Sequence, residues 1–231
     1  MLYAAAIPLL LRNPSIVVIP LLMAVIGVLL GVVMTPGGGG IEVATQGLAQ
    51  LIQFLLTLFG LGTACIIADD AWRHGRASFD RGWTEARRRG GEILMAAIGF
   101  GLLVTVGIYV AALLGVIGLL LTVVIIAFLI WTIPAAAVGG VPGGAAIQVS
   151  IDRVRATPLP AVIATVVAIA LLWYVVPHAQ AVLGGLLLSS SYGSLLLYRL
   201  VGALLQAIAI GYIALVITKT YTDGAFGTRG R

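Results

Sequence analysis

The stretch that decides the fold is residues 93–131, ILMAAIGFGLLVTVGIYVAALLGVIGLLLTVVIIAFLIW, which contains no charged side chain. A helix needs about 20 apolar residues to cross a hydrocarbon core about 30 Å thick. The stretch is too long for one crossing, so we expect two antiparallel helices, near 93–113 and 117–134. Gly115 and Gly118 stand between them, where a tight turn favours residues with a permissive backbone.

Other charge-free windows each have the length of one crossing, and they lie near 16–34, 48–68, 161–177 and 200–218. In lipid, backbone hydrogen bonds are satisfied only by helices or closed barrels, and these runs do not alternate as barrel strands do. The pattern predicts an all-α polytopic membrane protein, a single transmembrane domain over 1–231 with six helices. We expect Pro134 and Pro177 to end the fourth and fifth helices. Residues 178–199 are compatible with a re-entrant, an interfacial or a spanning segment.

The composition excludes a water-soluble globule and a disordered chain. Hydrophobic residues make up 61% of the 231 residues, charged residues only 9%, and the mean hydropathy is +1.16. Soluble domains are about one quarter charged, and disorder requires low hydrophobicity. The formal net charge of +5 indicates contact with anionic lipid headgroups rather than with nucleic acid. The single cysteine, Cys65, excludes an intramolecular disulfide.

Basic residues indicate the orientation of the chain in the membrane. With six crossings and the N-terminus inside, only Arg199 falls near the outer face, and positive residues concentrate on the cytoplasmic side of membrane proteins. We therefore expect both termini to be cytoplasmic. The bases on the cytoplasmic pieces are Arg12, Arg73, Arg76, Arg81, Arg87, Arg88, Arg89, Arg153, Arg155, Lys219, Arg229 and Arg231.

The segment 69–92 predicts a short interfacial helix. Ser78 is a suitable N-cap, and Phe79, Trp83 and Ala86 fall on one helical face. The alternative is a solvated loop whose charges only set the topology. We also expect short helices at 1–11 and 145–155. The residues expected to contact lipid headgroups are Arg73, Arg76, Arg81, Trp83, Arg87, Arg88, Arg89, Arg153 and Arg155.

Polar side chains also occur inside a predicted span. Gln46, Gln50, Gln53 and Thr57 are spaced so that they share one face of the second helix. Because amides are costly in lipid, this face should meet protein or a water-filled cavity, with Gln206 and Tyr212 of the last helix as partners. The face is either a helix-packing surface held by interhelical hydrogen bonds or a polar pocket for a ligand.

Acidic and histidine side chains cluster at the end of the second helix, at Asp69, Asp70, His74 and Asp80. Asp70 and His74 are one turn apart, a spacing that metal ligands use. Arg73 and Arg76 lie among them and would repel a cation, so a solvated, salt-bridged helix end is favoured. We predict no metal, no cofactor and no catalytic residue.

Short motifs then suggest a family. Residues 134–138 read Pro-Ala-Ala-Ala-Val, residues 150–155 read Ser-Ile-Asp-Arg-Val-Arg, and 220–223 read Thr-Tyr-Thr-Asp. Together with the charge-free helical pair, they resemble the six-helix membrane domain that accompanies some glycerophosphodiester phosphodiesterases, and stand-alone prokaryotic membrane proteins built like it. In that family arginine closely follows the terminal Tyr–Asp, whereas residues 224–228 intervene here. The resemblance implies a location in the prokaryotic cytoplasmic membrane, with no assigned activity.

Three functions fit the sequence. The first is a non-catalytic accessory or scaffold subunit, with membrane lipids and other membrane subunits as partners. The second is a small-solute transporter component that binds substrate on the face of Gln46, Gln50 and Gln53. The third is a lipid-processing enzyme that uses the carboxylates of 69–80, which we rank last because base and nucleophile candidates are sparse.

Overall fold

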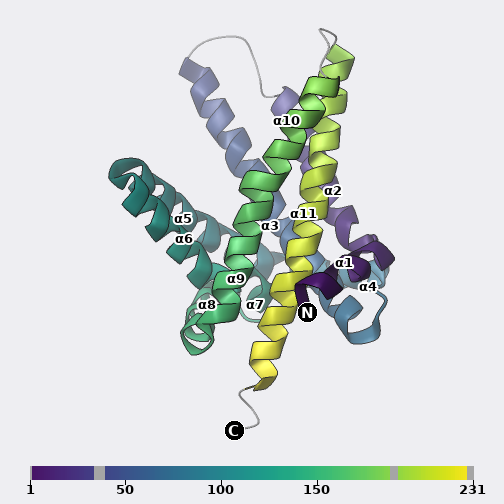
Figure 1. Ribbon diagram of the computed structural model, residues 1–231, viewed down its shortest axis with the longest axis vertical. Helices are drawn as coiled ribbons and strands as arrows, with labels where there is room; N and C mark the ends of the chain where they lie inside the picture. Colours follow the sequence, from purple (N-terminus) through teal and green to yellow (C-terminus); the bar gives the residue numbers. More distant parts are fainter. Residues whose placement is uncertain (1, 34–39, 188–191, 228–231) are drawn as a thin grey trace.

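The computed structural model describes residues 2–33, 40–187 and 192–227 (Figure 1). Met34, Arg229 and Arg231 lie outside the described residues, as does the side chain of Gln46. The described residues form helices and no strands. The helices are α1 (Leu2–Arg12), α2 (Ser15–Val33), α3 (Gly40–His74), α4 (Phe79–Arg88), α5 (Gly90–Leu114), α6 (Val116–Leu129), α7 (Thr132–Ala137), α8 (Gly143–Ala156), α9 (Pro158–Ile169), the π-helical η1 (Ala170–Val175), α10 (Val176–Leu187) and α11 (Tyr192–Gly227).

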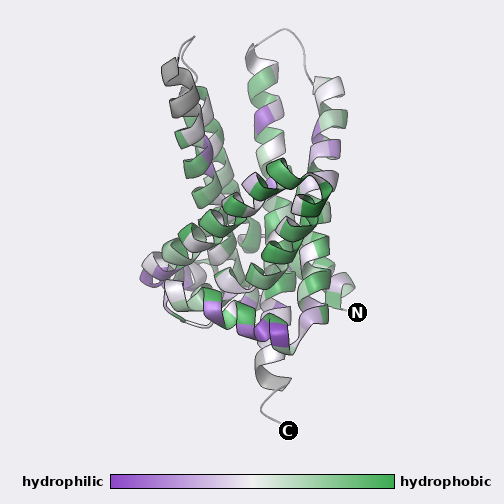
Figure 2. Ribbon diagram, turned by 90° about the vertical axis from the view of Figure 1, so that its left-hand side faces the viewer, coloured by the Kyte–Doolittle hydropathy of each residue, from purple (hydrophilic) through white to green (hydrophobic). Residues whose placement is uncertain are grey.

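The chain is a multi-pass membrane protein by the length and hydropathy of its helices. Among the described residues, 6 helical stretches are long and apolar enough to cross a membrane, which confirms the expected number. They are Ser15–Val32, Gly47–His74, Gly90–Leu114, Val116–Ala137, Pro158–Leu186 and Gly193–Gly224. Figure 2 shows apolar residues along the long helices and hydrophilic ones gathered near the end that carries the C-terminus.

The helical pair expected from residues 93–131 is present as α5 and α6. Gly115 alone joins them, with a φ of +58° that favours glycine. Gly118 faces the backbone of Val110 and Ala111, so the two helices approach closely because no side chain intervenes. The hairpin leans away from α9–α11 (Figure 1), and Leu113 at its tip is 84% exposed.

Two predictions about proline are wrong. The fifth span does not end at Pro177, because η1 lies just before this residue and the helix continues as α10. A π-turn displaces the carbonyl that a proline ring would otherwise meet, so the helix passes through Pro177. Pro134 does not end the fourth span either, since it lies in the first turn of α7, where a missing N–H costs nothing.

The described residues of the segment 178–199, for which the sequence allowed three structures, belong to two long helices. Its first part belongs to α10, and residues from Tyr192 onward begin α11, so the last helix starts earlier than the expected position near 200. Both parts are spanning helix within the described residues.

The core lies toward the end that carries the short helices. The side chains of Trp131, Ile133, Leu215 and Ile217 are almost fully buried, and every residue of α7 is buried. α7 packs against α3, α5, α8 and α11, so this one short helix joins most of the bundle. The short helix expected within 69–92 is present as α4, the one expected at 145–155 is present as α8, and Ser78 caps α4 by accepting from the Arg81 N–H.

Candidate functional site

A polar cavity of about 280 Å³ lies between α2, α3, α10 and α11, in the half of the molecule away from the short helices. We call it the glutamine cavity. It is lined by Ala24, Gly27, Val28, Gly31, Gln53, Gln180, Tyr198, Arg199, Gly202, Ala203 and Gln206. Side chains from residues far apart in sequence therefore converge on one space.

Glycines make room for two of the glutamines. A Cβ atom at Gly27 on α2 would lie 3.0 Å from Cγ of Gln53, and one at Gly202 on α11 would lie 2.6 Å from Nε2 of Gln180. Each amide thus occupies the space of a missing side chain on the facing helix. Gly27 therefore makes room for a polar side chain from the facing helix.

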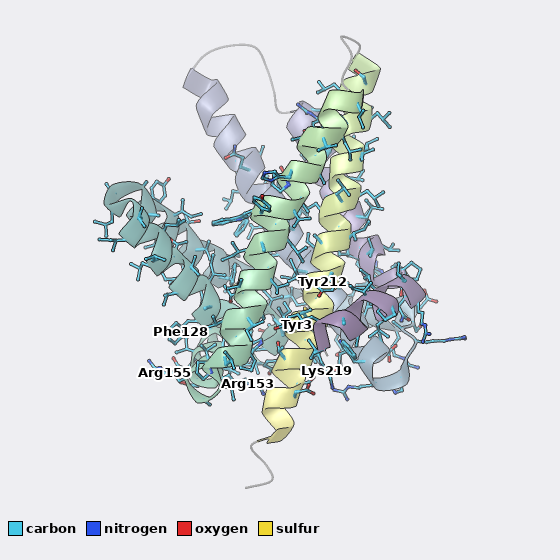
Figure 3. The ribbon with its side chains drawn as sticks, in the orientation of Figure 1. Tyr3, Phe128, Arg153, Arg155, Tyr212 and Lys219 are labelled. Atoms are coloured by element: carbon cyan, nitrogen blue, oxygen red, sulfur yellow. The ribbon has the colours of Figure 1, made fainter. Side chains whose placement is uncertain are left out.

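The residues of the expected polar face on the second span lie in different surroundings in the structure. Gln53 and Gln206 come together in the glutamine cavity, but Gln50 is exposed and is not among its lining residues. The hydroxyl of Thr57 donates to the backbone oxygen of Gln53 at 2.8 Å, and its side chain lines a separate apolar cavity of about 170 Å³. Tyr212 donates to the backbone oxygen of Tyr3 at 3.1 Å, where α1 crosses α11 (Figure 3), and does not meet the glutamines.

Sequence reasoning missed two residues of this site, Gln180 and Arg199. Gln180 follows Pro177, where we expected the helix to stop, so its register on a spanning helix was not considered. Arg199 was expected near the outer face of the membrane, with no part in a binding site. The signal for Gln180 is the pairing of an amide with a glycine on a neighbouring helix, which Gln53 and Gly27 also show, whereas Arg199 carries no such signal.

The lining of the glutamine cavity has unsatisfied donors. Within the described part of the chain, the carboxamides of Gln53, Gln180 and Gln206 have no hydrogen-bond partner, and Arg199 forms no ion pair. No carboxylate is among the lining residues that the structure describes. The cavity can therefore offer amide and hydroxyl groups and one permanent positive charge to a small ligand.

The opposite end of the molecule, which we call the arginine end, comprises residues 69–92, 132–157 and 219–224. Arg89 forms an ion pair with Glu85, and its Nη1 also donates to the backbone oxygens of Ala137 and Val138, each at 3.1 Å. Arg88 donates to the same Glu85 carboxylate at 2.6 Å. The hydrogen bonds from Arg88 and then Arg89 lower the pKa of Glu85 below its ordinary value.

The carboxylates considered for metal binding or catalysis hold the end of α3. Asp70 accepts from the backbone N–H of Ser78 at 3.0 Å, from Nδ1 of His74 at 2.9 Å and from Arg81 at 3.4 Å. Asp69 pairs with Arg73 at 2.8 Å. Among the described residues, no three histidine, cysteine or acidic side chains converge as metal ligands. The arrangement matches the favoured salt-bridged helix end.

Arg153 fastens α8 to the last helix. Its Nη1 donates to the backbone oxygen of Tyr221 at 2.6 Å, and its guanidinium lies 3.7 Å from the centre of the Tyr221 ring. Figure 3 shows Arg153 and Arg155 on α8, near the end of the bundle, and Lys219 on α11. Lys219 pairs with Asp223 at 2.7 Å. Arg153 is therefore a structural residue as well as a basic one.

The expected lipid-contact residues divide into two groups. The exposed ones are Arg73, Arg76, Arg81, Arg87, Arg88 and Arg155. The partly buried ones are Trp83, Arg89 and Arg153. Arg89 and Arg153 are used for contacts within the protein, and Arg87 lies over the Trp83 ring at 5.4 Å. Only the exposed group remains available to headgroups along most of its length.

Comparison of the chain with family models, with curated proteins and with solved structures finds no match. The chemistry of the two polar regions therefore rests on their own geometry. The arginine end contains ion pairs that hold helices together, and the glutamine cavity consists of polar groups around open space.

Proposed function

We propose that this chain is a non-catalytic accessory subunit of a membrane assembly, and that it binds a small polar solute in the glutamine cavity. The observation that carries this proposal is the convergence of Gln53, Gln180, Gln206 and Arg199 on one cavity, without partners among the described residues. Binding sites commonly combine an enclosed space with a few convergent polar groups. The proposal joins the accessory and the solute-binding alternatives derived from the sequence.

The chemistry of the lining favours a solute with hydrogen-bonding groups and negative charge. Arg199 supplies a cation that does not lose its proton, and the glutamines supply both donors and acceptors. The cavity volume of about 280 Å³ is close to the lower limit of typical ligand pockets, so the solute is small. A carboxylate or phosphate of low mass satisfies these requirements.

Both termini are proposed to be cytoplasmic, in the cytoplasmic membrane of a prokaryote. The six candidate spans are an even number, and the exposed arginines gather at the arginine end, which supports placing that end inside. The glutamine cavity then lies in the outer half of the bundle. In this orientation α1, α4 and α8 lie at the inner interface, and the expected kinship with the phosphodiesterase-associated membrane domain stays a prediction.

The arginine end is proposed to contact anionic lipid headgroups and partner subunits. Its exposed guanidiniums are Arg73, Arg76, Arg81, Arg87, Arg88 and Arg155. Basic residues near an anionic leaflet are each attracted by about 1 kcal/mol. The internal ion pairs of Glu85 and Asp70 hold this surface in a fixed shape, as a docking surface requires.

The test of solute binding uses a matched pair of glutamines on one helix. The purified chain in detergent is melted with inorganic phosphate, succinate or glutamine as the probe. We expect at least one probe to raise the melting temperature, Gln53→Leu and Gln206→Leu to abolish that rise, and Gln50→Leu to retain it. No stabilisation by any probe, or equal loss in Gln50→Leu, would overturn the proposal.

The accessory role has a separate test. Mild solubilisation of the native membrane is expected to release the chain in a larger assembly at fixed stoichiometry. Recovery of a solitary monomer under conditions that preserve other membrane complexes would contradict the role, whatever the outcome of the solute experiment.

A further inference from the structure

A second cavity, of about 590 Å³, lies where the junction of α1 and α2 meets the loop between α3 and α4. It is lined by Arg12, Asn13, Pro14, Ser15, Gly75, Arg76 and Ala77. Figure 1 shows α1 beside the region of α4, on the opposite side of the molecule from the α5–α6 hairpin. This cavity is separate from the glutamine cavity and from the ion pairs around Asp70 and Glu85.

Asn13 holds the two walls of this cavity together. Its side chain is only 3% exposed. Its amide nitrogen donates to the backbone oxygens of Leu9 at 2.9 Å and Gly75 at 3.4 Å, and its amide oxygen accepts from the backbone N–H of Ala77 at 2.7 Å. Segments more than 60 residues apart in sequence are thus joined by one buried amide. The backbones that carry Arg12 and Arg76 are fixed on either side of it.

The cavity carries unopposed positive charge. Arg12 and Arg76 are both exposed, and neither forms an ion pair with a described residue. No carboxylate is among the described lining residues, in contrast to the neighbouring cavity around Asp69, Asp70, Asp80 and Glu85.

We propose that this cavity binds one phosphate group, with Arg12 and Arg76 donating hydrogen bonds to its oxygens. Guanidinium groups match phosphate geometry through paired N–H donors. The volume of about 590 Å³ accommodates a phosphodiester together with its glycerol. The phosphate belongs either to an anionic phospholipid or to a soluble phosphate, since the recognising groups are the same.

The proposal does not depend on solute binding in the glutamine cavity. It also adds Arg12, which was not among the expected lipid contacts, and treats Arg76 as part of a built site rather than of a diffuse basic surface. On a diffuse basic surface, the loss of any exposed arginine would reduce phosphate binding by a similar amount. At a built site, the loss of Arg12 or Arg76 reduces it most.

The test measures the melting temperature of the full chain in neutral detergent with two probes. The first probe is dioleoyl phosphatidylglycerol in mixed micelles, and the second is sodium phosphate against sodium chloride of equal ionic strength. The variants are Arg12→Gln, Arg76→Gln and their combination. Arg155→Gln is the matched control: Arg155 is another exposed arginine at the arginine end, so its loss reports the diffuse contact of exposed arginines with headgroups, which is expected to be smaller than the effect at Arg12 or Arg76. Melting without a probe verifies that each variant folds.

We expect phosphatidylglycerol to raise the melting temperature of the wild type and of Arg155→Gln. The rise should fall by at least half in each single variant and vanish in the double variant. Stabilisation by phosphatidylglycerol alone supports the proposal with a lipid as the source, and stabilisation by sodium phosphate as well supports it with a soluble phosphate. No stabilisation by either probe, or an equal loss in Arg155→Gln, overturns it.

Discussion

The arginine end and the glutamine cavity use polar side chains in opposite ways. At the arginine end, Arg89 bonds to Glu85 and to two backbone oxygens of another segment, so both charges of this pair have partners in the protein. In the glutamine cavity, Gln53 and Gln180 occupy spaces left by glycines and face an opening. Polar groups with partners stabilise a fold, while polar groups beside open space are available to a ligand. The comparison predicts different consequences for substitutions in the two regions.

The largest loss of stability is expected from Arg89→Gln. The change removes the ion pair with Glu85 and leaves the backbone oxygens of Ala137 and Val138 without their charged donor. Hydrogen bonds to charged groups contribute about 1.5–3 kcal/mol each, so a loss of about 3 kcal/mol is expected. The measurement is equilibrium unfolding in mixed micelles. Arg88→Gln is the control, since the Arg88 side chain is exposed and should change little; a comparable loss there would contradict the distinction.

Glycine-to-alanine substitutions test the difference between the two regions more directly, because the same change is made in each. A Cβ atom at Gly82 would overlap the buried side chain of Ile67, which cannot move, so Gly82→Ala is expected to cost about 2 kcal/mol. A Cβ atom at Gly202 would meet only the mobile amide of Gln180. Gly202→Ala should therefore keep the melting temperature and lose the solute-dependent rise.

Gly185→Ala provides the control for this pair, because Gly185 on α10 lies outside the cavity lining and a Cβ atom there would have nothing within 4 Å. It should retain both stability and the solute response. If Gly202→Ala is destabilised as strongly as Gly82→Ala, the glutamine cavity is a packed region and not a binding site.

A smaller effect is expected from removing a buried hydrogen bond between α7 and α11. The indole N–H of Trp131 donates to the hydroxyl of Thr220 at 3.0 Å, and the Trp131 side chain is fully buried. Trp131→Phe is expected to lower the free energy of unfolding by about 1 kcal/mol through this bond. Trp173→Phe, at a residue 51% exposed, serves as the comparison in the same assay. An equal effect at both positions would count against a structural role for the bond.

The smallest effect concerns the pH dependence of stability at Glu85. Its pKa is lowered from an ordinary value of 4.5 by hydrogen bonds from Arg88 and Arg89. A carboxylate with a depressed pKa contributes stability above its unfolded pKa, and the contribution disappears as the pH falls through the folded pKa. We expect a slight fall in melting temperature below about pH 4.5, reduced in Glu85→Gln. An unchanged acid profile in this variant would exclude the contribution.

Part of the fold follows from the sequence because membrane crossing depends on local composition. A charge-free run of sufficient length must be a helix in lipid, so the number of spans and the turn at Gly115 could be predicted. The capped helix after Ser78 was also predictable, because capping is local. The course of the chain at Pro177 was not, since a π-turn that accommodates a proline depends on what the helix packs against.

The polar sites show the same division. The sequence by itself determined that glutamines lie on spanning helices and that arginines concentrate at one end, because both are properties of position along the chain. Only the tertiary structure decided that Gln53 faces a cavity while Gln50 is exposed, and that Gln180 and Arg199 join the site. The rotation of each helix about its axis decides which side chains converge. Packing against neighbouring helices sets that rotation, including the glycines that seat Gln53 and Gln180.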